Sequence, residues 1–369
     1  MDYREFKDYI KEHIKDSMPE KYADCEIGIV SVIKNNDTVL DGLLIKGDES
    51  NVTPNIYLNG YFEDYTDGRD MENILGEIAA IRMKMEKVQN FDVSQVMDYD
   101  KAKDYITCRL INAENNEQLL EDKPYTQKDD FAITYHVMIG SGEDGNYSVP
   151  IHNGIMEAYG VSIEELHNTA LRNMERLSPV QFSSMHEMME EMMLPNIMCE
   201  LGISEEEAKE IFAQMLPPVE GQMYCLTNKE KLNGASAILN QDIMDKIAEQ
   251  LGGDFYILPS SVHETLIVPK DAGMDYKELE SMVQEVNATQ VSAEERLSNH
   301  VYEYDSVAHE VVRSDKAEER KAMREAEKEK AGVTKEKKSL RGRLSEKRQK
   351  FLIRFRIMKR SMDVKRKKY

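Results

Sequence analysis

The distribution of charge along the chain constrains its fold more than any other feature. Up to Val312, 25 Lys and Arg residues stand against 60 Asp and Glu, a formal net charge of −35. From Arg313 to Tyr369, 23 basic residues stand against 9 acidic ones, a net charge of +14. The overall charge of −21 therefore hides an acidic body followed by a basic tail. Because the acidic body repels nucleic acid and anionic lipid, we expect the tail to bind any such partner.

The body is long enough for one large domain or two ordinary ones. No apolar run approaches the roughly 20 residues that span a bilayer, and the first residues lack the basic and apolar blocks of a secretory signal. The four cysteines, Cys25, Cys108, Cys199 and Cys225, are scattered without a Cys-x-x-Cys pair. This spacing indicates buried, reduced thiols, so we expect a cytoplasmic protein.

Apolar patterning predicts strands that come in adjacent pairs, separated by turn residues such as Asn35, Asn36 and Asp37. The predicted strands are residues 25–33, 38–45, 55–58, 131–139, 147–151, 222–226, 235–239, 255–258 and 265–268, with 301–304 as an edge strand. The predicted helices are residues 3–18, 70–88, 162–177, 204–215, 241–251 and 275–286. Two of these helices begin with predicted capping boxes, Ser162 with Glu165 and Ser204 with Glu207. Adjacent pairs of strands favour an α+β fold of antiparallel hairpins packed with helices, rather than a doubly wound sheet.

The positions of Pro and of charge predict three parts. Residues 1–216 form an N-terminal α+β lobe, and Pro217 and Pro218 separate it from a C-terminal α+β lobe at 217–312. Residues 313–369 form a basic helical or disordered tail, because 315–330 is almost entirely charged and Gly332 interrupts it.

A methionine-rich segment at residues 185–215 belongs to the first lobe. Its first part carries Met185, Met188, Met189, Met192, Met193 and Met198 among glutamates. Methionine is flexible and polarizable, so such a stretch fits ordinary helix packing or a promiscuous groove. A copper site is a further alternative, because thioethers suit soft metals.

Several segments of the body resemble an uncharacterised family of clostridial gut-type Firmicutes, a domain of unknown function often found near mobile elements. They are YCLTNKEKLNGA at 224–235, GDFYILPSSVHE at 253–264, EVNATQV at 285–291, RLIN at 109–112 and NNEQLLED at 115–122. The resemblance covers roughly residues 50–305 and implies a bacterial protein. Since the family has no assigned activity, the resemblance implies no functional residue.

Residues 259–264 contain the strongest catalytic candidates, Ser261 and His263. A Ser–His pair can activate a nucleophile, and Glu264 could orient an imidazole. Adjacent residues of an extended segment point to opposite faces, so Ser261 and His263 can share a face while Glu264 lies on the other. A structural turn would use the same Pro and Ser for backbone reasons alone.

No motif predicts a cofactor or a metal. His152, His167, His186 and His263 lack metal-ligand spacing, and the chain has no phosphate loop or dinucleotide fingerprint. The Gly-rich stretch at 140–146 lacks the spacing of a calcium loop, so we predict a hairpin turn there.

The end of the tail predicts a basic amphipathic helix at residues 340–362. Leu340, Leu344, Phe351, Phe355, Met358 and Met362 share one helical face. The predicted partner-binding residues are Arg341, Arg348, Lys350, Phe351, Arg354, Phe355, Arg356, Lys359, Arg360, Lys365, Arg366, Lys367 and Lys368.

Residues 340–369 are therefore predicted to bind nucleic acid through its phosphates, an anionic membrane surface, or an acidic protein. The acidic protein could be this chain's own body or a neighbouring copy, so the oligomeric state stays open. Three functions follow: an accessory or binding protein attached to a polyanion or acidic protein through its tail, an enzyme of unknown reaction near residues 259–264, and a membrane-surface protein.

Overall fold

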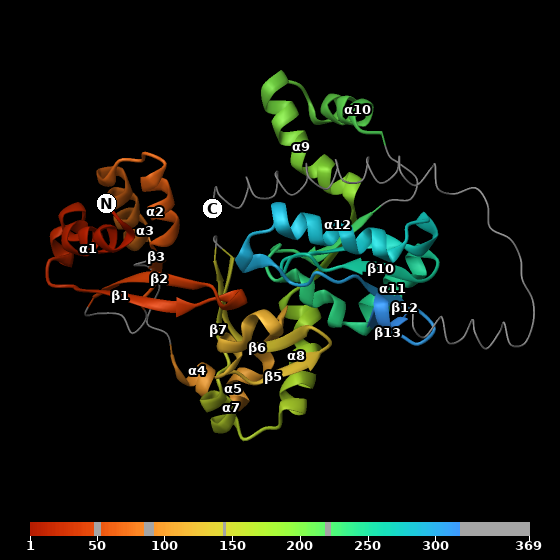
Figure 1. Cartoon of the computed structure of the whole chain (residues 1–369), viewed down its shortest axis with the longest axis horizontal. Helices are drawn as coiled ribbons and strands as arrows, with labels where there is room; N and C mark the ends of the chain where they lie inside the picture. The colour runs from red at the N-terminus through yellow and green to blue at the C-terminus, as the bar shows by residue number, and fades with distance from the viewer. Residues whose placement is uncertain (48–52, 85–91, 143–144, 218–222, 318–369) are drawn as a thin grey trace, which may run out of the picture.

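The computed structural model describes residues 1–47, 53–84, 92–142, 145–217 and 223–317. These residues form three antiparallel sheets with helices packed on them, as Figure 1 shows. The predicted α+β class is thereby confirmed. Antiparallel neighbours follow from the paired strands of the sequence, since short turns can join only antiparallel strands.

The first sheet belongs to an N-terminal unit, which we define as its three strands and their three helices. The strands are β1 (Glu26–Ile33), β2 (Val39–Lys46) and β3 (Asn55–Tyr57), and the helices are α1 (Tyr3–His13), α2 (Asn59–Thr66) and α3 (Met71–Lys84). Their apolar faces share a core of their own that includes Phe6, Ile10, Leu43 and Ile74. In Figure 1 the three helices lie on one side of this sheet.

The second sheet has four strands and a helix on one face. The strands are β4 (Ile106–Asn112), β5 (Tyr125–Lys128), β6 (Phe131–Gly142) and β7 (Gly145–Pro150), and β6 pairs with the other three. Four short helices accompany this sheet: α4 (Ser94–Met97), α5 (Tyr99–Ala102), α6 (Glu117–Leu120) and α7 (Asn153–Tyr159). The long helix α8 (Ile163–Leu177) packs Leu166 and Ala170 into the same core as Cys108 and Tyr135.

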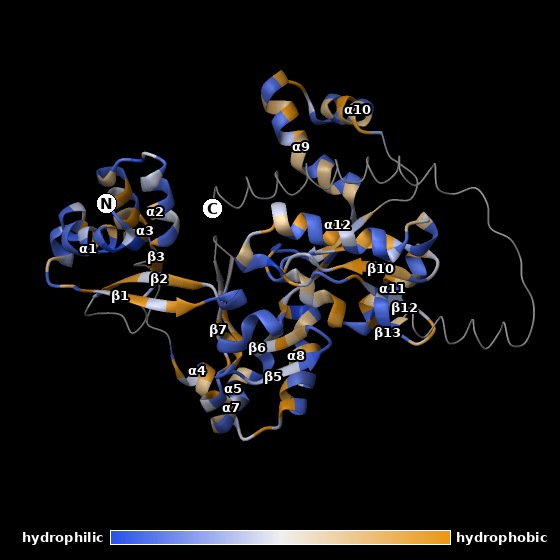
Figure 2. Cartoon of the chain, viewed as in Figure 1, coloured by the Kyte–Doolittle hydropathy of each residue, from blue (hydrophilic) through white to orange (hydrophobic). Residues whose placement is uncertain are grey.

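The third sheet has six strands in the order β13-β12-β10-β11-β9-β8. These strands are β8 (Val180–Ser184), β9 (Tyr224–Asn228), β10 (Phe255–Leu258), β11 (Thr265–Pro269), β12 (Tyr302–Asp305) and β13 (Glu310–Arg313). Every residue of β10 is buried, and Figure 2 shows that strand in hydrophobic colours.

Side chains that alternate along β10 enter two different cores. Phe255 and Ile257 join the core shared with the four-stranded sheet and α11 (Gln241–Leu251). Tyr256 and Leu258 face the opposite side, where α12 (Tyr276–Thr289) packs. The six-stranded sheet is therefore covered on both faces.

The methionine-rich segment forms α9 (Met185–Leu201) and α10 (Glu205–Met215). Its methionines divide between two apolar clusters: Met185, Met188 and Met192 pack beside β9 and α12, while Met189 packs with Phe212 of α10. The capping box of Ser204 and Glu207 is confirmed.

A second box, Ser184 with Glu187, begins α9 and was not predicted. At α8 only half of the predicted box forms. Ser162 accepts from the Glu165 amide, but the Glu165 carboxylate accepts from the Tyr99 hydroxyl instead.

Two predictions of strands were wrong. Residues 235–239 form part of a 3₁₀ helix, η7 (Gly234–Leu239), because Asn233 turns the chain in the left-handed region with φ 54° and the helix packs into the core. The strand predicted at the edge, β12, lies inside the sheet, because β13 pairs with its outer side.

The division into lobes at residue 217 stays a prediction. β8 precedes this boundary in the sequence, yet it pairs with β9 along its whole length. The third predicted part also begins inside the sheet, since β13 ends at Arg313. Any separation of the lobes has to keep β8 and β13 with the six-stranded sheet.

Within the described ranges, no helix is both long and apolar enough to cross a membrane.

Burial raises the pKa of the Cys108 thiol to about 12. Cys225 is also buried, whereas Cys199 is exposed, so the prediction of buried thiols holds for only part of the set.

Candidate functional site

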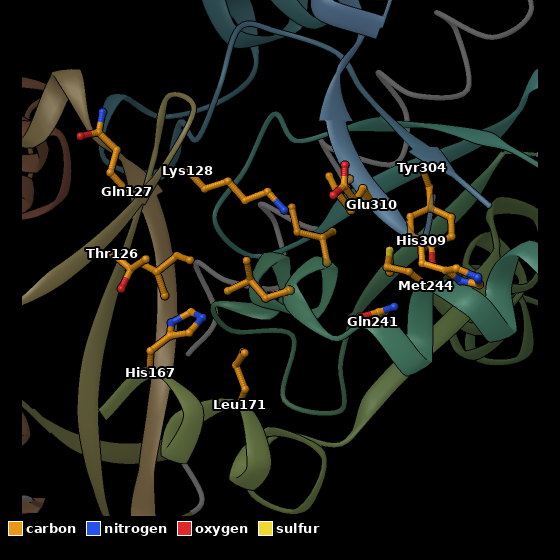
Figure 3. A pocket seen from close by; sticks show the side chains of 14 residues that line it. Thr126, Gln127, Lys128, His167, Leu171, Gln241, Met244, Tyr304, His309 and Glu310 are labelled. Carbon is orange, nitrogen blue, oxygen red and sulfur yellow. The ribbon is translucent and has the colours of Figure 1, made fainter. Parts of the chain in front are cut away.

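Polar and titratable side chains converge on a cleft between the four-stranded and six-stranded sheets. We call it the inter-sheet cleft; its volume is about 310 Å³, at the small end of the range for organic ligands. Its lining residues come from β5, β6, α8, η7, α11, β12 and β13, and Figure 3 shows them around the opening. They are Thr126, Gln127, Lys128, Ile133, His167, Leu171, Ile238, Leu239, Gln241, Met244, Tyr304, His309, Glu310 and Val311.

Lys128 and His167 supply cationic or proton-donating groups to one side of this cleft. Lys128 ends β5 and extends into the cleft, while His167 rises from α8 (Figure 3). Desolvation lowers the pKa of the Lys128 ammonium. Desolvation and the charge of Lys128 together lower the pKa of His167. No carboxylate in the described ranges forms a salt bridge with Lys128, although the charges of Asp129 and Glu310 act against the lowering of its pKa.

A chain of hydrogen bonds holds the His167 ring in place. The Tyr135 hydroxyl lies 3.0 Å from His167 Nδ1 and 2.6 Å from Thr126 Oγ1. Tyr135 of β6 is almost completely buried, and burial raises its pKa to about 12, so it stays a neutral phenol. Since Nδ1 is engaged by Tyr135, Nε2 is the His167 nitrogen left for a ligand.

The opposite wall is organised by Asp245 of α11. Its Oδ1 accepts from the Tyr304 hydroxyl at 2.6 Å and lies 2.6 Å from His309 Nδ1. These two bonds lower the pKa of Asp245, so its carboxylate is ionised at neutral pH. His309 sits in the turn between β12 and β13 with φ 56°, a left-handed conformation that aims its ring at Asp245.

The two walls suit different parts of one ligand. Lys128 and the Nε2 of His167 can donate to an anionic group. Leu171 and Leu239, which are partly exposed, supply apolar surface for a carbon skeleton. Gln241 and Glu310 add polar contacts on the far side (Figure 3). This combination can bind and orient a small organic anion.

The sequence candidates Ser261 and His263 lie elsewhere, in the connection between β10 and β11. Ser261 is completely buried and its Oγ accepts from the backbone amide of His263 at 3.1 Å. That bond is a local turn contact between a side chain and the backbone. The adjacent Glu264 is also buried.

The ring of His263 faces other groups than Ser261. Its Nδ1 accepts from the Asn233 amide at 3.1 Å, and its Nε2 lies 3.5 Å from Glu295 Oε1. The structure therefore brings the His263 backbone to Ser261 and the His263 ring to Asn233 and Glu295. Catalysis by this pair stays a prediction.

Across the described part of the chain, no group of three His, Cys, Asp or Glu side chains gathers as metal ligands would. The predicted partner-binding residues from Arg341 to Lys368 lie outside the described residues, as does most of the tail.

Sequence reasoning missed the inter-sheet cleft. His167 was considered only for metal binding, and Lys128, Asp245 and His309 stand far apart along the chain without a motif. One signal for the cleft existed in the sequence: Lys128 and Asp129 directly precede a strongly apolar strand. Charged residues at the end of a buried strand lie at the edge of the core, where a cleft can open. That signal alone could not show which residues lie opposite.

The three antiparallel sheets and the helices packed on them define a mixed α+β protein. Residues 3–306 match the model of a family of unknown function, DUF5688. The chain belongs to this family, which reaches further toward the N-terminus than the resemblance at 50–305 implied. No curated protein and no solved structure matches the chain.

Proposed function

We propose that the chain is a non-catalytic cytoplasmic binding protein whose inter-sheet cleft takes a small organic anion. The observation that carries this proposal is the Lys128 ammonium, which faces the cleft beside His167. In a body with a net charge of −35 up to Val312, a desolvated lysine beside a histidine favours recognition of an anion.

The lowered pKa values support the same proposal. Desolvation disfavours the charged forms of Lys128 and His167, and the charge of Lys128 also lowers the pKa of His167. An anion between them reverses both effects, so its binding raises both pKa values and takes up protons. Affinity should therefore fall as pH rises and Lys128 loses its proton.

The test is calorimetry on the full chain with succinate and benzoate as probes. Lys128→Gln and His167→Gln should each weaken binding of the best probe at least tenfold. Lys246→Gln is the matched control, since Lys246 is exposed on the same helix as Asp245 but does not line the cleft. No binding of any probe, or binding that Lys128→Gln leaves intact, would disprove the proposal.

A second proposed role concerns attachment through the basic tail. It is supported by the reversal of charge after Val312 and by the amphipathic pattern of residues 340–362. The tail binds a polyanion or an acidic protein, and the net charge of +14 from Arg313 onward supplies the attraction. The alternative partner is an anionic membrane surface.

Titration with duplex DNA at low and physiological salt tests this role. A variant with Lys365, Arg366, Lys367 and Lys368 all changed to Gln should bind DNA more weakly than the unchanged chain, and the salt dependence should become shallower. Anionic vesicles separate the alternative: Phe351→Ser with Phe355→Ser should weaken vesicle binding and leave DNA binding unchanged. Equal DNA binding by the Gln variant would exclude attachment through this cluster.

A further inference from the structure

A second, smaller cavity lies beside β4, an edge strand of the four-stranded sheet, and shares no lining residue with the inter-sheet cleft. Its volume is about 60 Å³. β4, β6 and the segment that follows β9 contribute most of its walls. The lining residues that matter to the argument are Arg109, Glu230, Asn228, Ser178 and Met138.

Arg109 projects from the polar face of β4. The register pairs Arg109 with Thr134 and Thr107 with His136, so these four side chains share the face opposite the apolar core. Arg109 Nη2 donates to Ser148 Oγ at 2.6 Å. Burial lowers the pKa of the guanidinium to about 10. No carboxylate in the described ranges forms an ion pair with Arg109, although a guanidinium shielded from water normally has such a partner.

Glu230 lines the same cavity with a carboxylate that is also unpaired. Its Oε2 is shielded from solvent and has no hydrogen-bond partner in the part of the chain that the structure describes. Glu230 and Arg109 therefore face one cavity with opposite charges, yet do not form a salt bridge with each other. A ligand with both charges would satisfy the two side chains at once.

The segment that carries Glu230 is held in place by Asn228. Asn228 Nδ2 donates to Ser178 Oγ and to the Leu232 carbonyl, both at 2.8 Å, and Asn228 Oδ1 accepts from the Leu232 amide at 3.1 Å. These bonds span the residues on both sides of Glu230. The backbone that carries the Glu230 carboxylate is therefore held in one conformation by hydrogen bonds. This reduces the conformational entropy that the segment loses when a ligand binds.

We propose that this cavity binds the zwitterionic backbone of a small α-amino acid, with its carboxylate on Arg109 and its ammonium on Glu230. The guanidinium fork matches a carboxylate in two parallel hydrogen bonds. A water needs about 10–15 Å³ of such volume, so a cavity of about 60 Å³ has room for roughly five heavy atoms, the number in glycine. Met138, Leu177 and Leu232 provide an apolar lining for the carbon atoms.

Calorimetric titration of the full chain with glycine and L-alanine tests this site. Both should bind, and Arg109→Gln and Glu230→Gln should each weaken them at least tenfold. Acetate and methylammonium serve as half-ligands: acetate binding should depend on Arg109 alone, and methylammonium binding on Glu230 alone. Glu191→Gln is the matched control, because exposed Glu191 lies beside Lys231 and does not line the cavity.

The outcomes separate this site from the inter-sheet cleft. Lys128→Gln should leave glycine binding unchanged, so either proposal can fail without the other. If Arg109→Gln does not fold, Glu230→Gln still decides, since Glu230 lies outside the strands. Absence of glycine binding would overturn the proposal. Glycine binding that Glu230→Gln leaves intact would overturn it too and would indicate a site for simple anions.

Discussion

Asn36 and Asn116 hold each other by two hydrogen bonds across the boundary between the N-terminal unit and the rest of the protein. The backbone N–H of Asn36 donates to Asn116 Oδ1 at 2.7 Å, and Asn116 Nδ2 donates to Asn36 Oδ1 at 3.1 Å. Asn36 Nδ2 also donates to the carbonyls of Ala293 and Arg296. The tip of the β1–β2 hairpin therefore contacts two distant segments through one side chain.

Asn36→Ala should loosen this attachment. The change removes the hydrogen bonds of the Asn36 side chain and places Ala at a φ of 58°, a left-handed conformation that Ala disfavours. The two effects together destabilise the contact by roughly 2–4 kcal/mol. The neighbouring Asp37 accepts from the amides of Gln118 and Leu119, so their hydrogen exchange reports the loss. We expect faster exchange at both amides. Asn115→Ala, at an exposed side chain next to Asn116, should leave the exchange unchanged; equal exchange in the two variants would contradict the prediction.

Tyr302→Phe should destabilise the junction of the two larger sheets. The Tyr302 hydroxyl donates to Asp130 Oδ1, and Ser298 Oγ donates to Asp130 Oδ2 at 2.6 Å. Asp130 is buried, so loss of one donor leaves a poorly satisfied carboxylate and costs about 1–3 kcal/mol. Urea unfolding measures the change. In the background of Asp130→Asn the same Tyr302→Phe change should cost less, and an equal cost would show that the two side chains are not coupled.

Stability should fall as the pH is lowered below about 6.5, and His136 is one cause. Burial lowers the pKa of His136 well below its ordinary value, and the charges of Arg109, Lys123 and His152 add to the effect. The unfolded chain takes up a proton at a pKa of about 6.5, whereas folded His136 stays neutral, so its contribution is complete above that pH and is lost below it.

Urea midpoints at pH 7.5 and pH 5.5 measure this dependence. His136→Gln should reduce the difference between the two midpoints, because Gln does not titrate. His13→Gln, at an exposed position of α1, is the control. An unchanged difference in His136→Gln would assign the pH dependence to other groups.

A chain that ends at residue 312 should be less stable than one that ends at residue 317. Residue 313 completes β13, and the Ser314 amide donates to the Val301 carbonyl at 2.9 Å. Ser314 is completely buried and Lys316 pairs with Asp129. Thermal unfolding of the two shortened chains tests this expectation. Equal midpoints would mean that residues 313–317 contribute nothing to the body.

Sequence patterning predicted the paired strands around Asn35, Asn36 and Asp37 and the helix cap at Ser204, because turns and caps depend on a few neighbouring residues. It was wrong about residues 235–239, where a short apolar run fits a strand or a buried 3₁₀ helix equally well. Only tertiary contacts separate those two structures.

The candidate sites show the same contrast. Ser261 and His263 were predicted as a pair because they lie two positions apart in the sequence, yet the His263 ring faces Asn233 and Glu295. Lys128, His167 and Asp245 lie in three different elements and share no sequence motif. Arg109 and Glu230 are likewise far apart in the sequence and share no motif. A spatial meeting of distant residues leaves no local pattern to detect.

The sequence by itself determined the α+β class, the helix caps, the acidic body and the change to a basic tail, since each follows from local composition or periodicity. Only the tertiary structure decided that β8 joins a sheet with strands far along the chain, and that Lys128 and Arg109 each face a cavity. The physical reason is that packing of the sheets selects which distant side chains meet, and their burial then sets the charge and chemistry of each site.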